Sequence, residues 1–339
     1  MEKCLNAAFH RSYGIRGTIF QKAYYVNTFM FSKLWFTAQF CKLDEKMLKK
    51  VLSKAMAFIY GGENERPVNS LNFRKTAEGG LGLFHPVIKA KALLVKTMYQ
   101  ELLALKGNIY DEEKIRKVYG YQQEFIEVIE NGLSTSPSKA IYDFLIKKVT
   151  HKNGSLIPSR SEKRSRNVQW GTVFRNLKLL SGLRADEKCF AWKVCQDMLP
   201  VGARIHRRNA ERRCLATLED GSQCQEIQDL EHAFKSCSTM VESYDLMVTA
   251  LNRITERNVD FNSLVHLSFN HRRKSKLKCA LWFAVKMMYN VFNRKLFNKA
   301  QLLQETLKEI DWNLSLNRRL GSEGEMVQLK EILLEIMNG

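Results

Sequence analysis

Apolar residues recur every three or four positions along most of the chain, the spacing that places them on one face of an α-helix. The clearest run starts after Asp44, a residue type that caps helix starts, and ends before Gly61-Gly62, which stops a helix. Comparable patterns occupy residues 18–40, 88–105, 168–180, 186–198, 241–256, 276–297, 301–311 and 325–337. The pattern therefore predicts a mainly α fold built from many separate helices.

Polar stretches containing Gly and Pro divide these helices into regions. Residues 150–167 are polar, basic and interrupted by Gly154 and Pro158, which is typical of a linker. The GGLGL sequence at 79–83 predicts a tight turn. We therefore expect a helical region at 1–149, a basic linker at 150–167, a region containing Cys and His at 168–300, and C-terminal helices at 301–339.

The charge of the chain points to a polyanionic partner. The sequence has 54 Lys and Arg against 35 Asp and Glu, a net charge of +19, and 45% hydrophobic residues, enough to bury a core. The positive charge is concentrated in residues 1–100, 146–213 and 269–299, and the last of these segments contains no acidic residue. Binding a nucleic acid would neutralise such blocks and release counterions. A solvated basic surface with no partner is the alternative interpretation.

The sequence indicates no membrane segment. The N-terminus lacks the apolar core of a signal peptide, and the apolar stretch 280–292 is too short to span a bilayer and contains Lys286. Most cysteines are scattered singly, as in a reducing compartment. We expect a soluble intracellular protein with no membrane contact. The basic run 163–166 slightly favours the nucleus over the cytoplasm.

Three of the eight cysteines lie close together with a histidine. Cys214, Cys224, His232 and Cys237 have the spacing C-x9-C-x7-H-x4-C, and Asp220-Gly221 can turn the chain back between the first two. Three thiolates and an imidazole are a ligand set that zinc accepts in a tetrahedron, and four protein ligands make such a site structural rather than catalytic. The alternative is that these residues are ordinary core cysteines and a capping histidine.

The surroundings of these residues resemble a known family. Trp192, a Leu199-Pro200 break, an Arg-rich stretch, the cysteines and Asp229 before His232 follow one another in order. This order resembles the zinc-binding region that follows the reverse transcriptase domain of non-LTR (LINE-type) retrotransposons. Further segments similar to that family lie at residues 14–40, 58–86 and 280–295. In many relatives the first two cysteines are only two residues apart, so Cys214 departs from the family pattern.

The resemblance implies a thumb-like and connector region at 1–149, a zinc-stabilised hairpin and helix motif, and flanking helices that grip nucleic acid. A catalytic palm is not expected in this chain, because the sequence has no Asp-Asp dipeptide, no nuclease signature and no phosphate-binding loop. We therefore expect a non-enzymatic fragment or remnant of a reverse transcriptase with structural zinc. RNA or DNA is the expected partner and a polymerase-bearing chain a possible second one, and no small-molecule substrate is expected.

The residues expected to contact phosphates lie in two basic arms on either side of the Cys/His region, which the zinc would fold into position. They are Arg204, Arg207, Arg208, Arg212, Arg213, Arg272, Arg273, Lys274, Lys276 and Lys278. Trp170, Phe190, Trp192 and Trp282 either stack on unpaired bases or belong to helix cores. Two other functions stay open: a helical protein–protein interaction module, and a decayed retroelement copy with no present activity.

Overall fold

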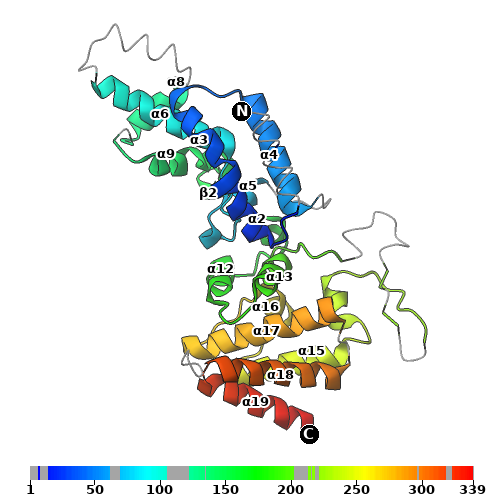
Figure 1. The fold of residues 1–339 in the computed structure, drawn as a ribbon. Coiled ribbons are helices and arrows are strands. Elements are labelled where there is room, and N and C mark those ends of the chain that lie inside the picture. The colour runs from blue at the N-terminus through cyan, green and yellow to red at the C-terminus, as the bar shows by residue number, and fades with distance from the viewer. Residues whose placement is uncertain are drawn as a thin grey trace. The chain divides into compact units, whose positions relative to one another are not determined.

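The computed structural model confirms a mainly α fold (Figure 1). It describes residues 7, 14–61, 69–104, 122–133, 135–201, 213–214, 216–217, 221–295, 298–317 and 323–338. The chain divides into two compact units, residues 1–157 and 158–339. Each unit has its own buried residues and is described by itself. Among the described residues, no helix combines the length and apolarity that crossing a membrane requires.

Unit 1 is built around one long helix. Its elements are α2 (Ile19–Tyr25), the π-helical η1 (Val26–Met30), α3 (Ser32–Phe40), α4 (Glu45–Tyr60), α5 (Asn69–Phe73), η2 (Thr76–Glu78), α6 (Pro86–Ala104), α8 (Gln122–Glu130), α9 (Ser138–Leu145), α10 (Lys147–Thr150), β1 (His151–Lys152) and β2 (Ser155–Leu156). Helices α3, α4 and α9 pack against α6, whose Leu94, Val95 and Met98 are fully buried. As the sequence predicts, Asp44 caps α4 by accepting from two backbone amides, and Gly61 ends the helix at a positive φ of 65°.

The GGLGL segment begins with the predicted turn, in which Gly79 has a positive φ of 76°, and residues 81–83 continue as an irregular strip, the GGLGL strip. The amides of Leu81, Gly82 and Leu83 donate to carbonyls within residues 71–74 at 2.9 to 3.2 Å. Asn27 in η1 holds the far end, because its side chain donates to the Gly82 carbonyl and accepts from the Phe84 amide, both at 2.9 Å. A Cβ on Gly80 would lie 2.3 Å from the Arg74 carbonyl oxygen. Glycine is therefore needed here because two backbone segments approach closely.

Most of the segment 150–167, which its composition predicts to be a linker, is folded. Strands β1 and β2 form an antiparallel hairpin whose turn residues, Asn153 and Gly154, both have positive φ. Asn-Gly is the favoured pair for such a two-residue turn. Helix α11 (Arg160–Arg164) then starts with a capping box made by Ser159 and Glu162. The boundary between the two units, at Ile157-Pro158, falls inside this segment.

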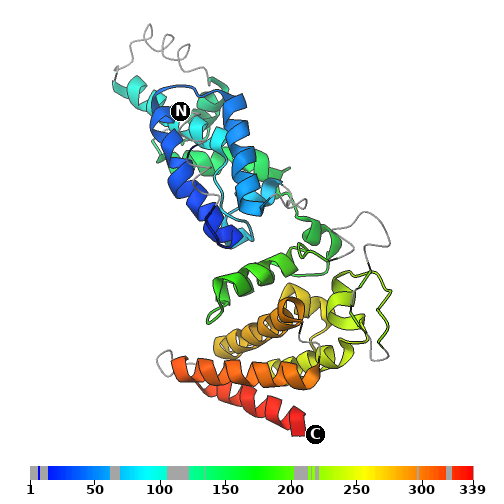
Figure 2. The ribbon, with the colours of Figure 1, turned by 45° about the vertical axis from the view of Figure 1, so that its right-hand side comes forward.

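Unit 2 is a helical assembly around α17. Its helices after α11 are α12 (Trp170–Leu179), α13 (Ala185–Cys195), the π-helical η4 (His232–Ser236), α15 (Val241–Thr255), α16 (Phe261–His266), α17 (Lys274–Arg294), α18 (Lys299–Asn317) and α19 (Glu323–Asn338). Helix α17 packs against α12, α13, α15, α18, α19 and η4. Figure 2 shows α18 and α19 stacked in layers next to α17. Burial against helices on several sides explains why most residues of α17 between Leu277 and Val291 are apolar.

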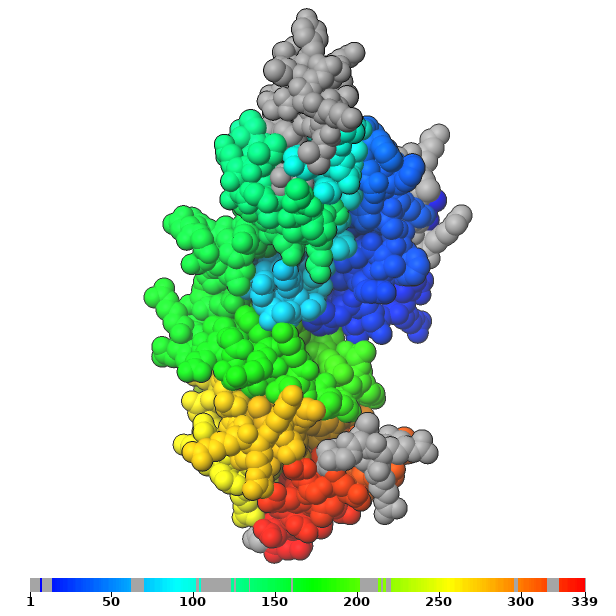
Figure 3. Space-filling model, turned by 90° about the vertical axis from the view of Figure 1, so that its left-hand side faces the viewer, coloured from blue at the N-terminus to red at the C-terminus, as the bar shows by residue number. Residues whose placement is uncertain are grey.

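The C-terminal helices belong to the core of unit 2 instead of forming a region of their own. Leu302, Ile310, Leu329 and Leu333 are buried in the same hydrophobic cluster as α17. On the face drawn in Figure 3, the red surface of α19 adjoins the gold surface of the N-terminal part of α17. There the Cys279 thiol donates to the Glu325 carbonyl at 3.4 Å. Unit 2 therefore extends to the end of the described chain.

A buried charge network joins three helices of unit 2. The Lys286 ammonium in α17 lies 2.7 Å from a Glu187 carboxylate oxygen in α13 and 2.8 Å from a Glu309 carboxylate oxygen in α18. Arg184 approaches Glu187 at 3.1 Å and Arg294 approaches Glu309 at 3.0 Å. Each buried carboxylate is thus shared by two cations, which compensates for the cost of removing it from water.

Candidate metal centre

A short hairpin brings the first two cysteines together. Two antiparallel bridges, Arg213–Ile227 and Thr217–Gln223, pair the segment that contains Cys214 with the segment that contains Cys224. The Cys214 amide donates to the Glu226 carbonyl at 2.8 Å, and the Cys224 amide donates to the Ala216 carbonyl at 2.9 Å. Gly221 has a φ of +81°, as expected for a turn residue, whereas Asp220 lies outside the described residues. The hairpin places Cys214 and Cys224 on adjacent strands.

The π-helical turn η4 supplies the other two side chains. The Asp229 carboxylate accepts from the His232 amide at 2.8 Å, which fixes the start of the turn. The turn ends at Cys237, whose amide donates to the His232 carbonyl at 3.2 Å. An i to i+5 hydrogen bond brings residues 232 and 237 to the same side of the chain. His232 and Cys237 therefore both face the hairpin.

The four predicted ligand atoms meet in one buried cluster. The three sulfurs and the imidazole nitrogen all lie within 4.8 Å of one another, and all four residues are buried. The Cys214 and Cys237 sulfurs are 4.0 Å apart, and the Cys224 sulfur is 3.4 Å from His232 Nε2. A tetrahedral zinc ion with Zn–S of ~2.3 Å and Zn–N of ~2.0 Å requires S···S of about 3.8 Å and S···N of about 3.6 Å. The cluster can therefore hold a metal ion such as zinc.

The chemistry around the sulfurs also fits a cation. The Ala216 amide donates to the Cys214 sulfur at 3.4 Å, and the Thr239 hydroxyl lies 3.2 Å from the Cys237 sulfur. The pKa of the Cys214 thiol is raised to about 11, mainly by burial and also by the neighbouring Cys237 and Cys224 thiols, while the Ala216 amide opposes the shift. A divalent ion stabilises adjacent thiolates that would otherwise repel one another in a buried site.

Aromatic packing anchors the cluster to the core of unit 2. The Phe234 side chain in η4 is completely buried, and its ring centroid lies 5.9 Å from that of Phe292 in α17. The Phe292 ring is also 5.9 Å from the Phe190 ring in α13. The cluster is therefore attached at the C-terminal end of α17.

The structure describes one residue of the first predicted basic arm and all five residues of the second. Arg204, Arg207, Arg208 and Arg212 lie outside the described residues. Arg213 is exposed, and its guanidinium donates to the Gln225 side chain at 2.8 Å.

In the second arm, Arg272, Arg273 and Lys274 are exposed at the N-terminal end of α17. Lys278 is half-buried, and Lys276 forms an ion pair with Glu256 at 2.8 Å.

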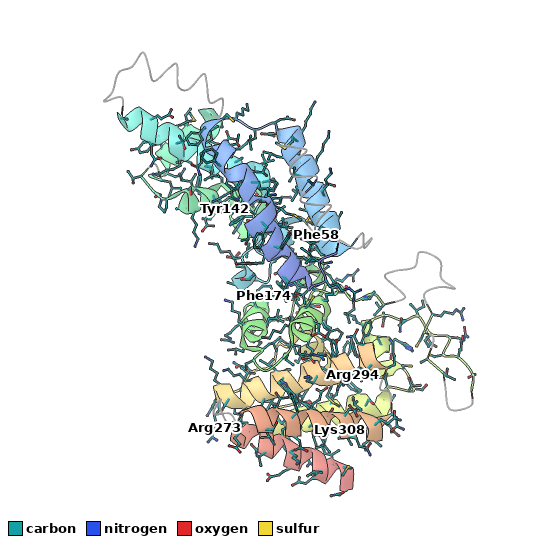
Figure 4. The ribbon with its side chains drawn as sticks, viewed as in Figure 1. Phe58, Tyr142, Phe174, Arg273, Arg294 and Lys308 are labelled. Atoms are coloured by element: carbon teal, nitrogen blue, oxygen red, sulfur yellow. The ribbon has the colours of Figure 1, made fainter. Side chains whose placement is uncertain are left out.

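The second arm is remote from the metal cluster. Arg273 and Arg294 mark the two ends of α17 (Figure 4), and the cluster packs at the Arg294 end through Phe292. Nineteen residues separate Arg273 from Phe292, which corresponds to about 28 Å along a helix axis. The expectation that zinc directly folds a hinge between the two arms therefore needs revision, because α17 separates the second arm from the cluster.

Three of the aromatic residues considered for base stacking are core residues. Phe190, Trp192 and Trp282 are all at most 5% exposed. Trp170 is half-buried, and its ring lies against Phe174 and His266. Helix packing accounts for all four side chains.

No protein-family model matches the sequence, and the searches of curated proteins and of solved structures also found no match.

Proposed function

We propose that this chain is a non-catalytic nucleic-acid-binding protein whose unit 2 is stabilised by a structural zinc ion. Cys214, Cys224, His232 and Cys237 would hold the ion. Four protein ligands leave no open coordination position for a substrate, which favours a structural role. The ion would supply the charge that lets three thiolates share a buried site and would fix the hairpin against η4.

The observation that carries the proposed binding is the cation cluster at the start of α17. Arg272, Arg273 and Lys274 are exposed and form no ion pair within the described residues, and the first turn of α17 contains no acidic residue. The N-terminal end of a helix is already positive because its amides point outward, so cations there are unfavourable without an anion. Phosphate groups of RNA or DNA would neutralise both sources of charge.

The test is a fluorescence anisotropy titration with single-stranded RNA and DNA at increasing salt. Changing Arg272, Arg273 and Lys274 together to Gln should weaken binding by about tenfold or more. It should also reduce the slope of log affinity against log salt by about one per lost phosphate contact.

A charge-matched control replaces Arg253, Lys308 and Lys330 by Gln. These three cations already pair with carboxylates, so they should contribute little to phosphate binding. Equal losses in the two triple variants, or wild-type binding that does not weaken with salt, would contradict the proposed function.

A second candidate, a protein–protein interaction module, is favoured by an exposed aromatic face in unit 1. Tyr24, Phe29, Phe36 and Phe40 are each more than half exposed along the helix formed by α2, η1 and α3. Large exposed apolar patches are rare on monomeric proteins and mark interaction sites. Binding of a partner that resists salt and nuclease, and that is lost when Phe36 and Phe40 are changed to Ser, would favour this function over the first.

A further inference from the structure

A cavity of about 520 Å³ lies within unit 1, next to the GGLGL strip. It is bounded by the end of α5, the start of α6 and the α9 and α10 helices (Figure 4, near Tyr142). This volume is in the range of pockets that bind small molecules. The lining contains five Lys or Arg side chains and only two carboxylates, so the cavity carries an excess of positive charge.

The two carboxylates that line the cavity, Asp143 and Glu78, both lie near Lys75. The Lys75 ammonium lies 2.9 Å from the Asp143 carboxylate, and Glu78 is also close enough to Lys75 to raise its pKa. Lys89, Lys139 and Lys147 line the same cavity and form no ion pair within the described residues. The cavity lining therefore includes three lysines that have no carboxylate within ion-pair distance among the described residues.

Lys89 is the most constrained of the three. It is half-buried, and its ammonium lies 5.3 Å from the centroid of the Phe84 ring and 5.5 Å from that of the Tyr142 ring. The two rings are perpendicular, with centroids 5.5 Å apart, so they form a corner around the cation. Burial lowers the pKa of the Lys89 ammonium, and the Asp143 carboxylate only partly opposes this. An anion placed here would recover the electrostatic stabilisation that burial removes.

The neighbouring groups add donors around Lys89. The Tyr142 hydroxyl accepts from the His85 amide at 3.0 Å and keeps its own hydrogen to donate. Burial raises the pKa of the Tyr142 phenol, so the hydroxyl stays protonated at neutral pH. Lys139 and Lys147 lie four residues before and after Asp143, on one side of the helical segment formed by α9 and α10.

We propose that this cavity binds a phosphate group, carried either by a small phosphorylated molecule or by a nucleic-acid strand. A phosphate monoester has a charge between about −1.5 and −2 at neutral pH and several acceptor oxygens, which suits three ammonium groups and a hydroxyl donor. Lysine binds phosphate as a compact point charge, as it does in phosphate-binding loops. The inference depends on unit 1 alone and does not rest on the zinc site or on the start of α17.

The direct test is isothermal titration calorimetry of inorganic phosphate into the full chain at constant ionic strength. Saturable binding is expected for the wild type, and Lys89→Gln should weaken it by about tenfold. Lys96→Gln is the matched control, because Lys96 is another half-buried lysine of α6, donates to the Thr135 carbonyl at 3.4 Å and does not line the cavity. The affinity of the Lys96→Gln variant for inorganic phosphate should stay within about twofold of that of the wild type.

A second variant keeps the test decisive if Lys89→Gln does not fold. Lys139 and Lys147 are exposed, so the double change Lys139→Gln/Lys147→Gln should leave folding intact and still weaken phosphate binding by about fivefold or more. Absence of saturable phosphate binding, or affinity that is independent of Lys89, Lys139 and Lys147, would overturn the proposal.

A parallel titration with the single-stranded octamer of dT distinguishes the two sources of phosphate. If a strand is the ligand, Lys89→Gln should weaken octamer binding by about tenfold, Lys96→Gln should not, and inorganic phosphate should compete. If a small molecule is the ligand, only the binding of inorganic phosphate should depend on Lys89.

Discussion

Changing Cys224 to Ser should abolish high-affinity zinc binding and lower the free energy of unfolding of unit 2 by at least about 3 kcal/mol. Structural zinc contributes ~10–16 kcal/mol in small zinc-dependent peptides, so the loss of one ligand has a large effect. The hairpin at 213–227 has little else to stabilise it, since Ile227 is half exposed and the strands are joined by isolated bridges. Hydrogen exchange should show loss of protection at the Cys214 and Cys224 amides.

The matched control for this change is Cys195→Ser. Cys195 is fully buried in α13, but its thiol contacts the Val265 carbonyl and it is not part of the metal cluster. This variant should keep its zinc and the protection of the hairpin amides, at a cost of about 1–2 kcal/mol for a buried hydroxyl. If the two variants lose the same stability and protection, the hairpin does not depend on a metal.

Changing Lys286 to Met should destabilise unit 2 by about 3–5 kcal/mol, because it leaves two buried carboxylates with one cation fewer. Glu187 is completely buried, and the Lys286 ammonium is the closest of its two cations. The double variant Lys286→Met/Glu187→Gln should recover part of this loss, because one uncompensated charge is removed with its partner. Urea unfolding followed by circular dichroism measures both effects.

The surface ion pair between Lys330 and Asp311 provides the comparison. Its two atoms are also 2.7 Å apart, but both side chains are at least one-third exposed. Lys330→Met should therefore cost no more than about 1 kcal/mol. A Lys286→Met variant as stable as Lys330→Met would show that water reaches the Lys286 network and that burial does not control its strength.

The helices of this protein could be predicted from the sequence because helix signals are local. The pattern after Asp44 gave α4 with its cap and its stop, and the pattern at 241–256 gave α15 almost to the residue. The GGLGL strip could not be predicted, since it depends on contacts with residues 71–74 and with Asn27, which is remote in sequence. The hairpin at 151–156 had a local signal, the Asn153-Gly154 turn, which the polar composition of the segment obscured.

The candidate site was predictable in its residues but only partly in its surroundings. The spacing of Cys and His identified four side chains, Cys214 among them, that the fold brings together. The sequence could not show that α17 separates the second basic arm from the cluster, because this follows from which end of the helix packs on Phe234. Nor could the sequence show that Glu187 in α13 and Glu309 in α18 form ion pairs with Lys286, because all three residues are remote from one another along the chain.

The most direct test of the proposed zinc site is the metal content of the purified chain, measured by inductively coupled plasma mass spectrometry. One zinc per chain is expected in the wild type and in Cys195→Ser. Loss of that zinc is expected in Cys214→Ser, Cys224→Ser, His232→Ser and Cys237→Ser, each measured separately. A folded wild type without bound metal, or variants at these four positions that keep a full complement of zinc, would contradict the proposed site.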